Sequence, residues 1–220
     1  MSLRLVLLGP PGVGKGTQAN LLSDKFRIPK ISTGDILRKA IEDNSPLGQI
    51  AKKTIGQGKL VADDVVIGII EERLKKEDCK KGFILDGFPR TVPQADALSQ
   101  ITSIDHVISI EVRSSEIVKR LEGRRTCKRC QKMFHLEFQP PKKEGICDDC
   151  QGELIHRKDD GRATIEKRLK EYQEQTAPLL EYYTENIRSI DGMGEIQEIF
   201  FRILKKIEGG NDHLKVYKRN

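Results

Sequence analysis

The chain has 220 residues, 37% hydrophobic and 33% charged, a composition that suits one folded domain with room for a small insertion. No apolar run approaches the roughly 18 residues that a membrane-spanning helix needs, and the start carries no signal-peptide pattern, so we expect a cytoplasmic protein. The net charge of +6 favours an anionic partner, which by charge alone is nucleic acid, a membrane surface or a phosphorylated small molecule.

Short aliphatic runs alternate with segments of helical spacing. Leu3–Leu8 is typical of a strand buried on both faces, and similar runs recur at 82–86, 107–110 and 187–190. Segments such as 65–74 and 114–121 have helical spacing. This alternation predicts an α/β fold, with right-handed crossovers and a parallel sheet covered by helices on both faces.

A glycine-rich loop, Gly-Pro-Pro-Gly-Val-Gly-Lys-Gly-Thr, follows the first predicted strand from Gly9 to Thr17. Backbone N–H groups of such a loop encircle a phosphate, the next helix adds its positive end, and Lys15 reaches the β- and γ-phosphates. The alternative is an ordinary glycine-rich turn, which explains neither the preceding strand nor the lysine. The predicted phosphate-binding residues are Gly12, Val13, Gly14, Lys15, Gly16 and Thr17.

Asp86 ends the predicted strand 82–86, beside the phosphate loop. A carboxylate there can hold the water shell of Mg²⁺. A simple capping role at the strand end is the alternative.

The alternation stops between about Thr126 and Gly161. Two Cys-x-x-Cys pairs stand there with sixteen residues between them, a spacing typical of structural zinc sites. Four thiolates fill a tetrahedral Zn²⁺, so the metal would organise the insertion and not catalyse. Two disulfides are the alternative, which a reducing cytoplasm disfavours. The predicted ligands are Cys127, Cys130, Cys147 and Cys150, which leaves Cys79 as a free thiol.

A helical pattern resumes at Ala163 and runs through Arg168 and Tyr172 towards Tyr183. Earlier, Thr33 stands two residues before Asp35, which is plausible N-cap chemistry for another helix. The end of the chain, 209–220, is polar and basic and reads as a flexible tail.

The Gly14-Lys15-Gly16-Thr17 ending has glycine where phosphate loops usually have Ser or Thr, and it resembles the adenylate kinase family. The resemblance implies that the Thr17 hydroxyl lies near Mg²⁺. The similarity extends to about Ile207 through several separate blocks. It implies a P-loop kinase fold with a five-stranded parallel sheet, and reversible transfer of the γ-phosphoryl group of Mg-ATP to AMP, giving two ADP. The implied division is core at 1–31, 62–123 and 163–208, an AMP-binding segment at 32–61, a zinc-binding lid at 124–162 and the tail at 209–220.

The resemblance assigns the AMP side to several blocks. Arg90 would hold the AMP phosphate and Gln94 would recognise its adenine, roles that suit a guanidinium and a carboxamide. After Val61 the chain has Ala-Asp-Asp, where the family usually has Pro followed by Asp-Glu. The implied AMP-binding residues are Thr33, Arg38, Lys59, Leu60, Val61, Gly87, Phe88, Pro89, Arg90, Gln94, Arg157 and Arg168.

On the ATP side the resemblance adds Arg120, Arg124, Phe134 and Gly194 to the phosphate loop. Phe134 stands where the family often has Tyr, which keeps base stacking and loses a hydroxyl. Each arginine taken alone could be a surface residue. The implied catalytic residues are Lys15, Arg90, Arg124, Arg157 and Arg168.

Two other functions remain open from the residues. One is a kinase for another nucleoside monophosphate, and the other is a nucleic-acid-binding P-loop ATPase whose cysteines form a zinc ribbon. We expect instead a monomer that uses ATP, AMP and ADP with Mg²⁺ and a structural Zn²⁺, and that binds neither nucleic acid nor membrane.

Overall fold

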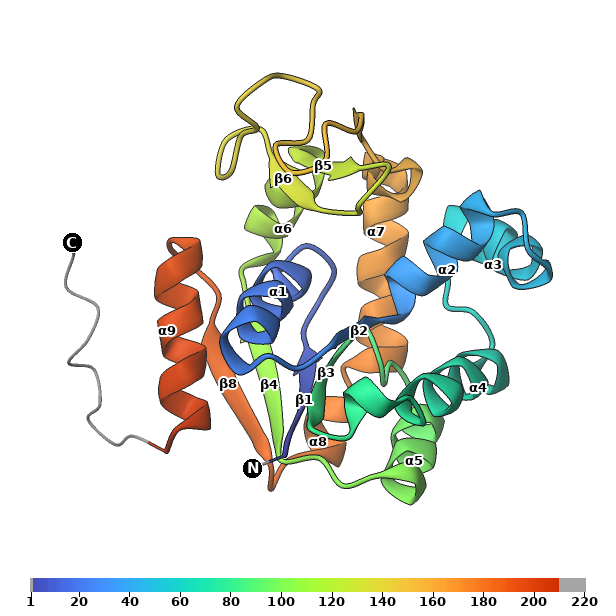
Figure 1. Cartoon of the computed structure of the whole chain (residues 1–220), viewed down its shortest axis with the longest axis vertical. Coiled ribbons are helices and arrows are strands. Elements are labelled where there is room, and N and C mark those ends of the chain that lie inside the picture. The colour runs from blue at the N-terminus through green and yellow to red at the C-terminus, as the bar shows by residue number, and fades with distance from the viewer. Residues whose placement is uncertain (1, 210–220) are drawn as a thin grey trace.

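Residues 2–209 are the part of the chain that the computed structural model describes, and a five-stranded parallel sheet lies at their centre (Figure 1). Its strands are β1 (Leu3–Leu8), β2 (Lys30–Ser32), β3 (Gly82–Asp86), β4 (His106–Glu111) and β8 (Ile187–Asp191), in the order β2-β3-β1-β4-β8. The predicted α/β class and four predicted strands are confirmed. At three residues, β2 is too short to form a recognisable apolar run.

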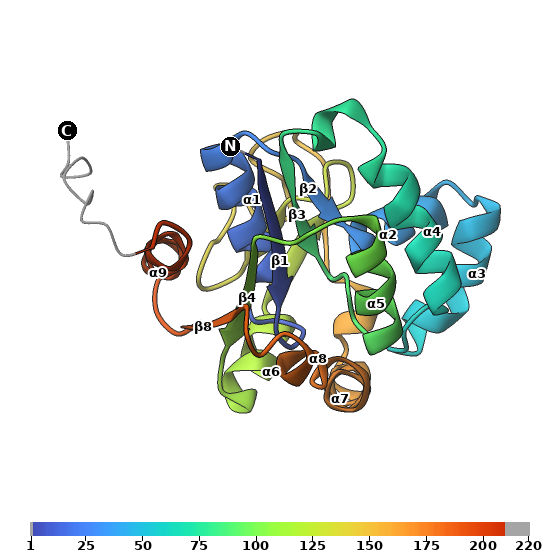
Figure 2. The same ribbon diagram turned by 90° about the horizontal axis from the view of Figure 1, so that it is seen from below.

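Two hydrophobic cores cover the sheet, because successive side chains of β1 point to opposite faces. Leu5 and Leu7 pack with α1 (Lys15–Phe26), α6 (Ser114–Glu122) and α9 (Ile196–Ile207). Val6 and Leu8 pack with α4 (Asp63–Leu74) and α5 (Val92–Ile101). Figure 2 shows α1 and α9 on one side of the strands and α5 on the other. The sheet is therefore a fixed base for the loops at the carboxyl ends of its strands.

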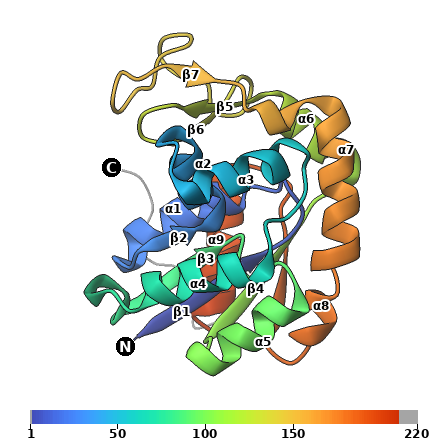
Figure 3. The same cartoon turned by 90° about the vertical axis from the view of Figure 1, so that its right-hand side faces the viewer.

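The insertion folds as a small unit around a three-stranded sheet, and we refer to residues 124–162 as the lid. It contains the antiparallel strands β5 (Arg124–Cys127), β6 (Met133–His135) and β7 (Leu154–Ile155), in the order β6-β5-β7, and the 3₁₀ turn η2 (Lys158–Asp160). Figure 3 shows it above α2 (Thr33–Glu42) and α3 (Pro46–Gly56). Among residues 124–162, all of which are described, the buried core comprises Cys127, Phe134, Cys147 and Leu154. Such a core is too small to stabilise the lid by burial alone.

Two details differ from expectation. The N-cap of α2 is Ser32, whose hydroxyl accepts a hydrogen bond from the Asp35 N–H, so the cap role considered for Thr33 is wrong. The helix expected towards Tyr183 is also interrupted. It runs as α7 (Arg162–Glu171), a π-helical turn (Tyr172–Thr176) and α8 (Leu179–Tyr182), because Pro178 has no N–H to continue a regular ladder.

A further 3₁₀ turn, η1 (Glu77–Cys79), precedes β3. Except for Gly209, the expected tail at 209–220 lies outside the described residues. Within 2–209, no helix has the length and apolar content that crossing a membrane would require.

Candidate active site

The phosphate loop joins β1 to α1 and depends on backbone angles that favour glycine. Gly12 has φ 85° and Gly14 has φ 99°, both in the left-handed region. A Cβ at Gly12 would lie 2.8 Å from Leu121 Cγ, so α6 also requires glycine there. Gly14 begins α1 without a side-chain cap. No side chain caps the first N–H groups of α1, which leaves them for an anion.

Lys15 lies deep in this loop. Its Nζ donates to the carbonyl oxygens of Gly9 at 2.6 Å and Pro10 at 2.8 Å. Burial lowers the lysine pKa to about 7; Asp86 opposes this shift, whereas Arg90 and other arginines add to it. The negative charge of an arriving polyanion would favour the protonated lysine and so offset both the desolvation and the repulsion from the arginines.

Asp86 ends β3 next to the loop, where a Cβ on Gly16 would lie 3.2 Å from its Oδ2. Asp86 and Thr17, which carry a carboxylate and a hydroxyl, both line the same cavity. Oxygen donors at a phosphate loop suit Mg²⁺, which keeps several waters and binds through one or two protein groups. These residues therefore fit the expected ion.

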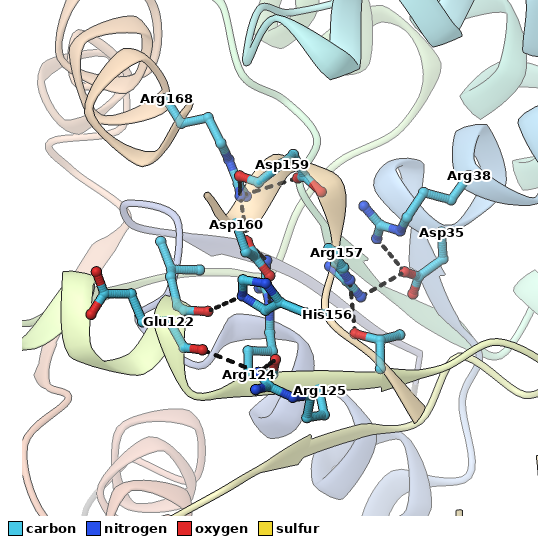
Figure 4. A network of polar contacts seen from close by, with 12 residues as sticks. Asp35, Arg38, Glu122, Arg124, Arg125, His156, Arg157, Asp159, Asp160 and Arg168 are labelled. Carbon is cyan, nitrogen blue, oxygen red and sulfur yellow. Dashed lines mark hydrogen bonds and ion pairs between the residues drawn. The ribbon is translucent and has the colours of Figure 1, made fainter. Parts of the chain in front are cut away.

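Two arginines share one buried carboxylate (Figure 4). Arg124, from β5, donates from Nε to Asp160 Oδ2 at 2.7 Å, and Arg168, from α7, donates to Asp160 Oδ1 at 2.8 Å. Arg168 also donates to the Asp159 carbonyl at 3.0 Å. Asp160 is completely buried. A lid residue thus fixes two cations that come from different elements.

Arg157 connects the lid with α2. Its Nε donates to Thr126 Oγ1 at 2.8 Å, and its Nη2 lies 4.0 Å from Asp35 Oδ1 in α2. Asp35 also pairs with Arg38, as Figure 4 shows. Burial lowers the Arg157 pKa to about 9, and the neighbouring Arg124 and Arg38 add to the shift. Such crowding of buried cations is expected where polyanions bind.

The segment after β3, residues 87–90, forms another part of the cavity wall, and we call it the strip. Arg90 Nε donates to the Gly87 carbonyl at 2.8 Å, and Thr33 Oγ1 donates to the same oxygen at 2.7 Å. Gln94 Oε1 accepts from the Arg90 N–H at 2.8 Å. Burial, followed by repulsion from Arg168, lowers the Arg90 pKa to about 10. The strip is thus held by both α2 and α5.

With one exception, the residues predicted to bind nucleotide or Mg²⁺ line a common cavity of about 510 Å³. The exception is Phe88, whose side chain is fully buried in the core and so ties the strip to the core. Phe134 lines the cavity but belongs to the lid core. The more exposed ring is Phe138, which stacks on His135 at 4.4 Å and also lines the cavity. Sequence reasoning missed Phe138, although an aromatic in so charged an insertion was a usable signal.

The four predicted zinc ligands lie together in the lid. Their sulfur atoms are all within 4.8 Å of one another, with Cys127 and Cys150 3.3 Å apart and Cys130 and Cys147 3.6 Å apart. A tetrahedral zinc with Zn–S bonds of about 2.3 Å requires S···S distances of roughly 3.8 Å. The thiol cluster therefore fits one Zn²⁺.

Each of the two cysteine pairs lies in a turn, and the two turns have the same geometry. Gln131 and Gln151 have φ 60° and 59° and donate their N–H groups back to the Cys127 and Cys147 carbonyls, each at 3.0 Å. A Cβ on Gly152 would lie 3.0 Å from Cys127 Sγ. The backbone is therefore shaped to bring the thiols close together.

Comparisons with known proteins agree with this geometry. A family model described as "Adenylate kinase" matches residues 7–188. The adenylate kinase of Geotalea daltonii is 55% identical over 214 residues, covering 94% of this chain and all of the relative. That of Geobacter sp. strain M21 is 55% identical over 212 residues (93% and 99%), and that of Geobacter sulfurreducens is 49% identical over 216 residues (95% and 100%). The similarity thus covers the loop, the strip and the lid.

Proposed function

We propose, since this chain belongs to the adenylate kinase family, that its cavity holds ATP beside the phosphate loop and AMP beside Gln94. The activity is that of the family: reversible transfer of the γ-phosphoryl group of ATP to AMP, giving two ADP. The observation that carries this proposal is that five cationic side chains line one cavity: Lys15, Arg90, Arg124, Arg157 and Arg168.

Cations, rather than a base or nucleophile, suit this transfer. The acceptor oxygen of AMP is already ionised, and charge spreads over the equatorial oxygens as the phosphoryl group moves. The protein must align donor and acceptor and neutralise that charge. Lys15 would do so at the β- and γ-phosphates of ATP, and Arg90 at the phosphate of AMP. Arg124, Arg157 and Arg168 would contact the phosphoryl group between them.

The nucleotide bases would occupy opposite ends of the cavity. Arg120 donates to the Gly192 carbonyl at 3.0 Å and lines the ATP end with Gly194. We assign base stacking there to the exposed ring of Phe138 as well as Phe134. Lys59, Leu60 and Val61 line the AMP end with Gln94.

Water must be excluded, or ATP would be hydrolysed. Arg124, Arg157 and Asp160 all belong to the lid, so its closure would complete the site and expel water together. We assign 32–61 and 124–162 as the two units that move against the core. When bound, Mg²⁺ at Asp86 and Thr17 would supply positive charge to the β- and γ-phosphates, and Zn²⁺ would hold the lid in shape.

An acceptor panel tests the function directly. With Mg-ATP, ADP should form when AMP is supplied, and far less with GMP, CMP, UMP or single-stranded oligonucleotide. Gln94→Ala should then raise the KM for AMP and leave that for ATP near its original value. Strong preference for another acceptor would contradict the assignment. We also propose a cytoplasmic monomer without nucleic-acid or membrane partners, for which gel filtration tests the monomer.

A further inference from the structure

Asp63 reaches from the first turn of α4 to the start of α5. Its Oδ1 accepts a hydrogen bond from Gln94 Nε2 at 2.7 Å, and its Oδ2 accepts one from Thr91 Oγ1 at 2.9 Å. With both oxygens engaged, the carboxylate cannot rotate freely. Asp63 is not among the site residues expected from the sequence.

These contacts determine which way the Gln94 amide faces. A carboxylate only accepts hydrogen bonds, whereas the Arg90 N–H, which Gln94 Oε1 accepts at 2.8 Å, only donates. A half-turn of the amide would place donor against donor and acceptor against acceptor. Gln94 is 2% exposed, so water could not replace the lost bonds. The amide orientation therefore follows from the chemistry of its two partners.

The remaining hydrogen-bonding capacity of Gln94 has a defined direction. One N–H of Nε2 and one lone pair of Oε1 are left for a ligand in the cavity. A 6-aminopurine offers the matching pair, an acceptor at N1 and a donor at N6. A 6-oxopurine offers the reverse, a donor at N1 and an acceptor at O6, and would oppose both groups.

We propose that Asp63 is a specificity-determining residue, which holds the Gln94 amide in the orientation that accepts 6-aminopurine nucleotides and rejects 6-oxopurine nucleotides. It acts through Gln94 and is thus a positioning residue. The inference rests on the proposed placement of the AMP adenine beside Gln94. Sites built to hydrogen-bond a substrate reject mismatched analogues strongly, because their own buried groups are left unpaired.

The test compares AMP with IMP, which differs at the base edge, in the wild-type chain and in Asp63→Asn. Asparagine can present either its oxygen or its nitrogen to Gln94, so the amide becomes free to turn. The measured quantities are the KM for AMP and the inhibition constant of IMP against AMP. We expect the KM for AMP to rise roughly tenfold, as for the loss of one charge-assisted hydrogen bond. The inhibition constant of IMP should stay the same or fall. The preference for AMP over IMP should therefore drop by about tenfold or more.

Asp64→Asn is the matched control. It removes the same charge from the same helical turn, but the Asp64 side chain is exposed. It should keep the wild-type preference. The preference is a ratio within one protein and does not depend on how much of a sample is folded. An unchanged ratio in Asp63→Asn, an equal weakening of AMP and IMP, or an equal effect in Asp64→Asn would overturn the inference. Wild-type ADP formation that does not depend on AMP would instead refute the proposed function.

Discussion

Arg124 is paired with Asp160 through two parallel hydrogen bonds, in which a lid arginine meets a completely buried carboxylate. The pair joins the start of the lid to its end, 36 residues later. Arg168 donates to the same carboxylate from outside the lid. Two proposed catalytic cations thus share one acidic group.

Asp160→Asn should therefore reduce activity more than a lid surface change would. The amide accepts on one atom and opposes a guanidinium with the other, so Arg124 and Arg168 lose their common anchor. We expect kcat/KM to fall roughly 10- to 100-fold, about 1.4 to 2.7 kcal/mol, with a lower melting temperature. Glu153→Gln, in an exposed lid pair at 3.9 Å, is the control. Wild-type kcat/KM in Asp160→Asn would show that the anchor is dispensable.

Binding of ATP should be accompanied by proton uptake at Lys15. Its pKa of about 7 in the free chain leaves the amine mostly neutral at pH 8.5, and the triphosphate would raise that pKa again. Calorimetric titrations in buffers of different ionisation enthalpy should give an uptake approaching one proton at pH 8.5 and close to none at pH 6. Lys15→Met should abolish the uptake and most activity; uptake that persists in this variant would assign the proton to another group.

The lowered pKa of Lys15 also makes the free energy of unfolding depend on pH. A lysine whose pKa falls on folding binds its proton more weakly in the native state, so its neutral form favours the native chain at high pH. That contribution is present above the unfolded value near 10.5 and is lost as the pH falls towards 7. Lys15→Met should flatten this part of the dependence of unfolding free energy on pH, measured without nucleotide.

Removal of zinc should act on the lid. We expect one zinc per chain by metal analysis, and a lower thermal stability after chelation or in Cys147→Ser, because metal binding supplies local folding free energy. Activity should persist at low temperature and fall as temperature rises. Cys79→Ser changes a buried thiol outside the cluster and should leave the metal content unchanged. Absence of zinc, or loss of chemistry at low temperature with a folded lid, would contradict a structural role.

Helix α3, in the segment proposed to bind AMP, provides a matched pair of glycines, Gly48 and Gly56. A Cβ at Gly48 would collide with the Ala40 carbonyl, because α2 and α3 are in close contact there, whereas a Cβ at Gly56 has nothing within 4 Å. Gly48→Ala should destabilise the segment by about 2 kcal/mol or more and weaken AMP binding. Gly56→Ala should be neutral or stabilising by up to about 1 kcal/mol. Thermal melts and the KM for AMP measure both, and equal effects would show that close packing at Gly48 is not the cause.

Fixed local spacing explains which parts were predictable. The phosphate loop and the cysteine pairs each bring their groups together within one turn, so the pattern alone predicts roles for Lys15 and Cys127. Asp63 and Asp160 carry no such pattern, because their partners Gln94 and Arg124 lie 31 and 36 residues away in the chain. Their positions depend on tertiary packing, which a single sequence does not specify.

The π-helical turn at Tyr172–Thr176 restricts the length of the chain between Arg168 and Leu179. A π turn holds more residues than an α turn, and each residue of a regular helix advances the side chains by about 100°. Arg168 faces the nucleotide cavity, while Leu179 is fully buried in the core. Deleting one residue here would change the relative direction of these two side chains and turn one of them away from its place. Insertions and deletions should therefore be tolerated far less in this stretch than in the exposed loops of the lid.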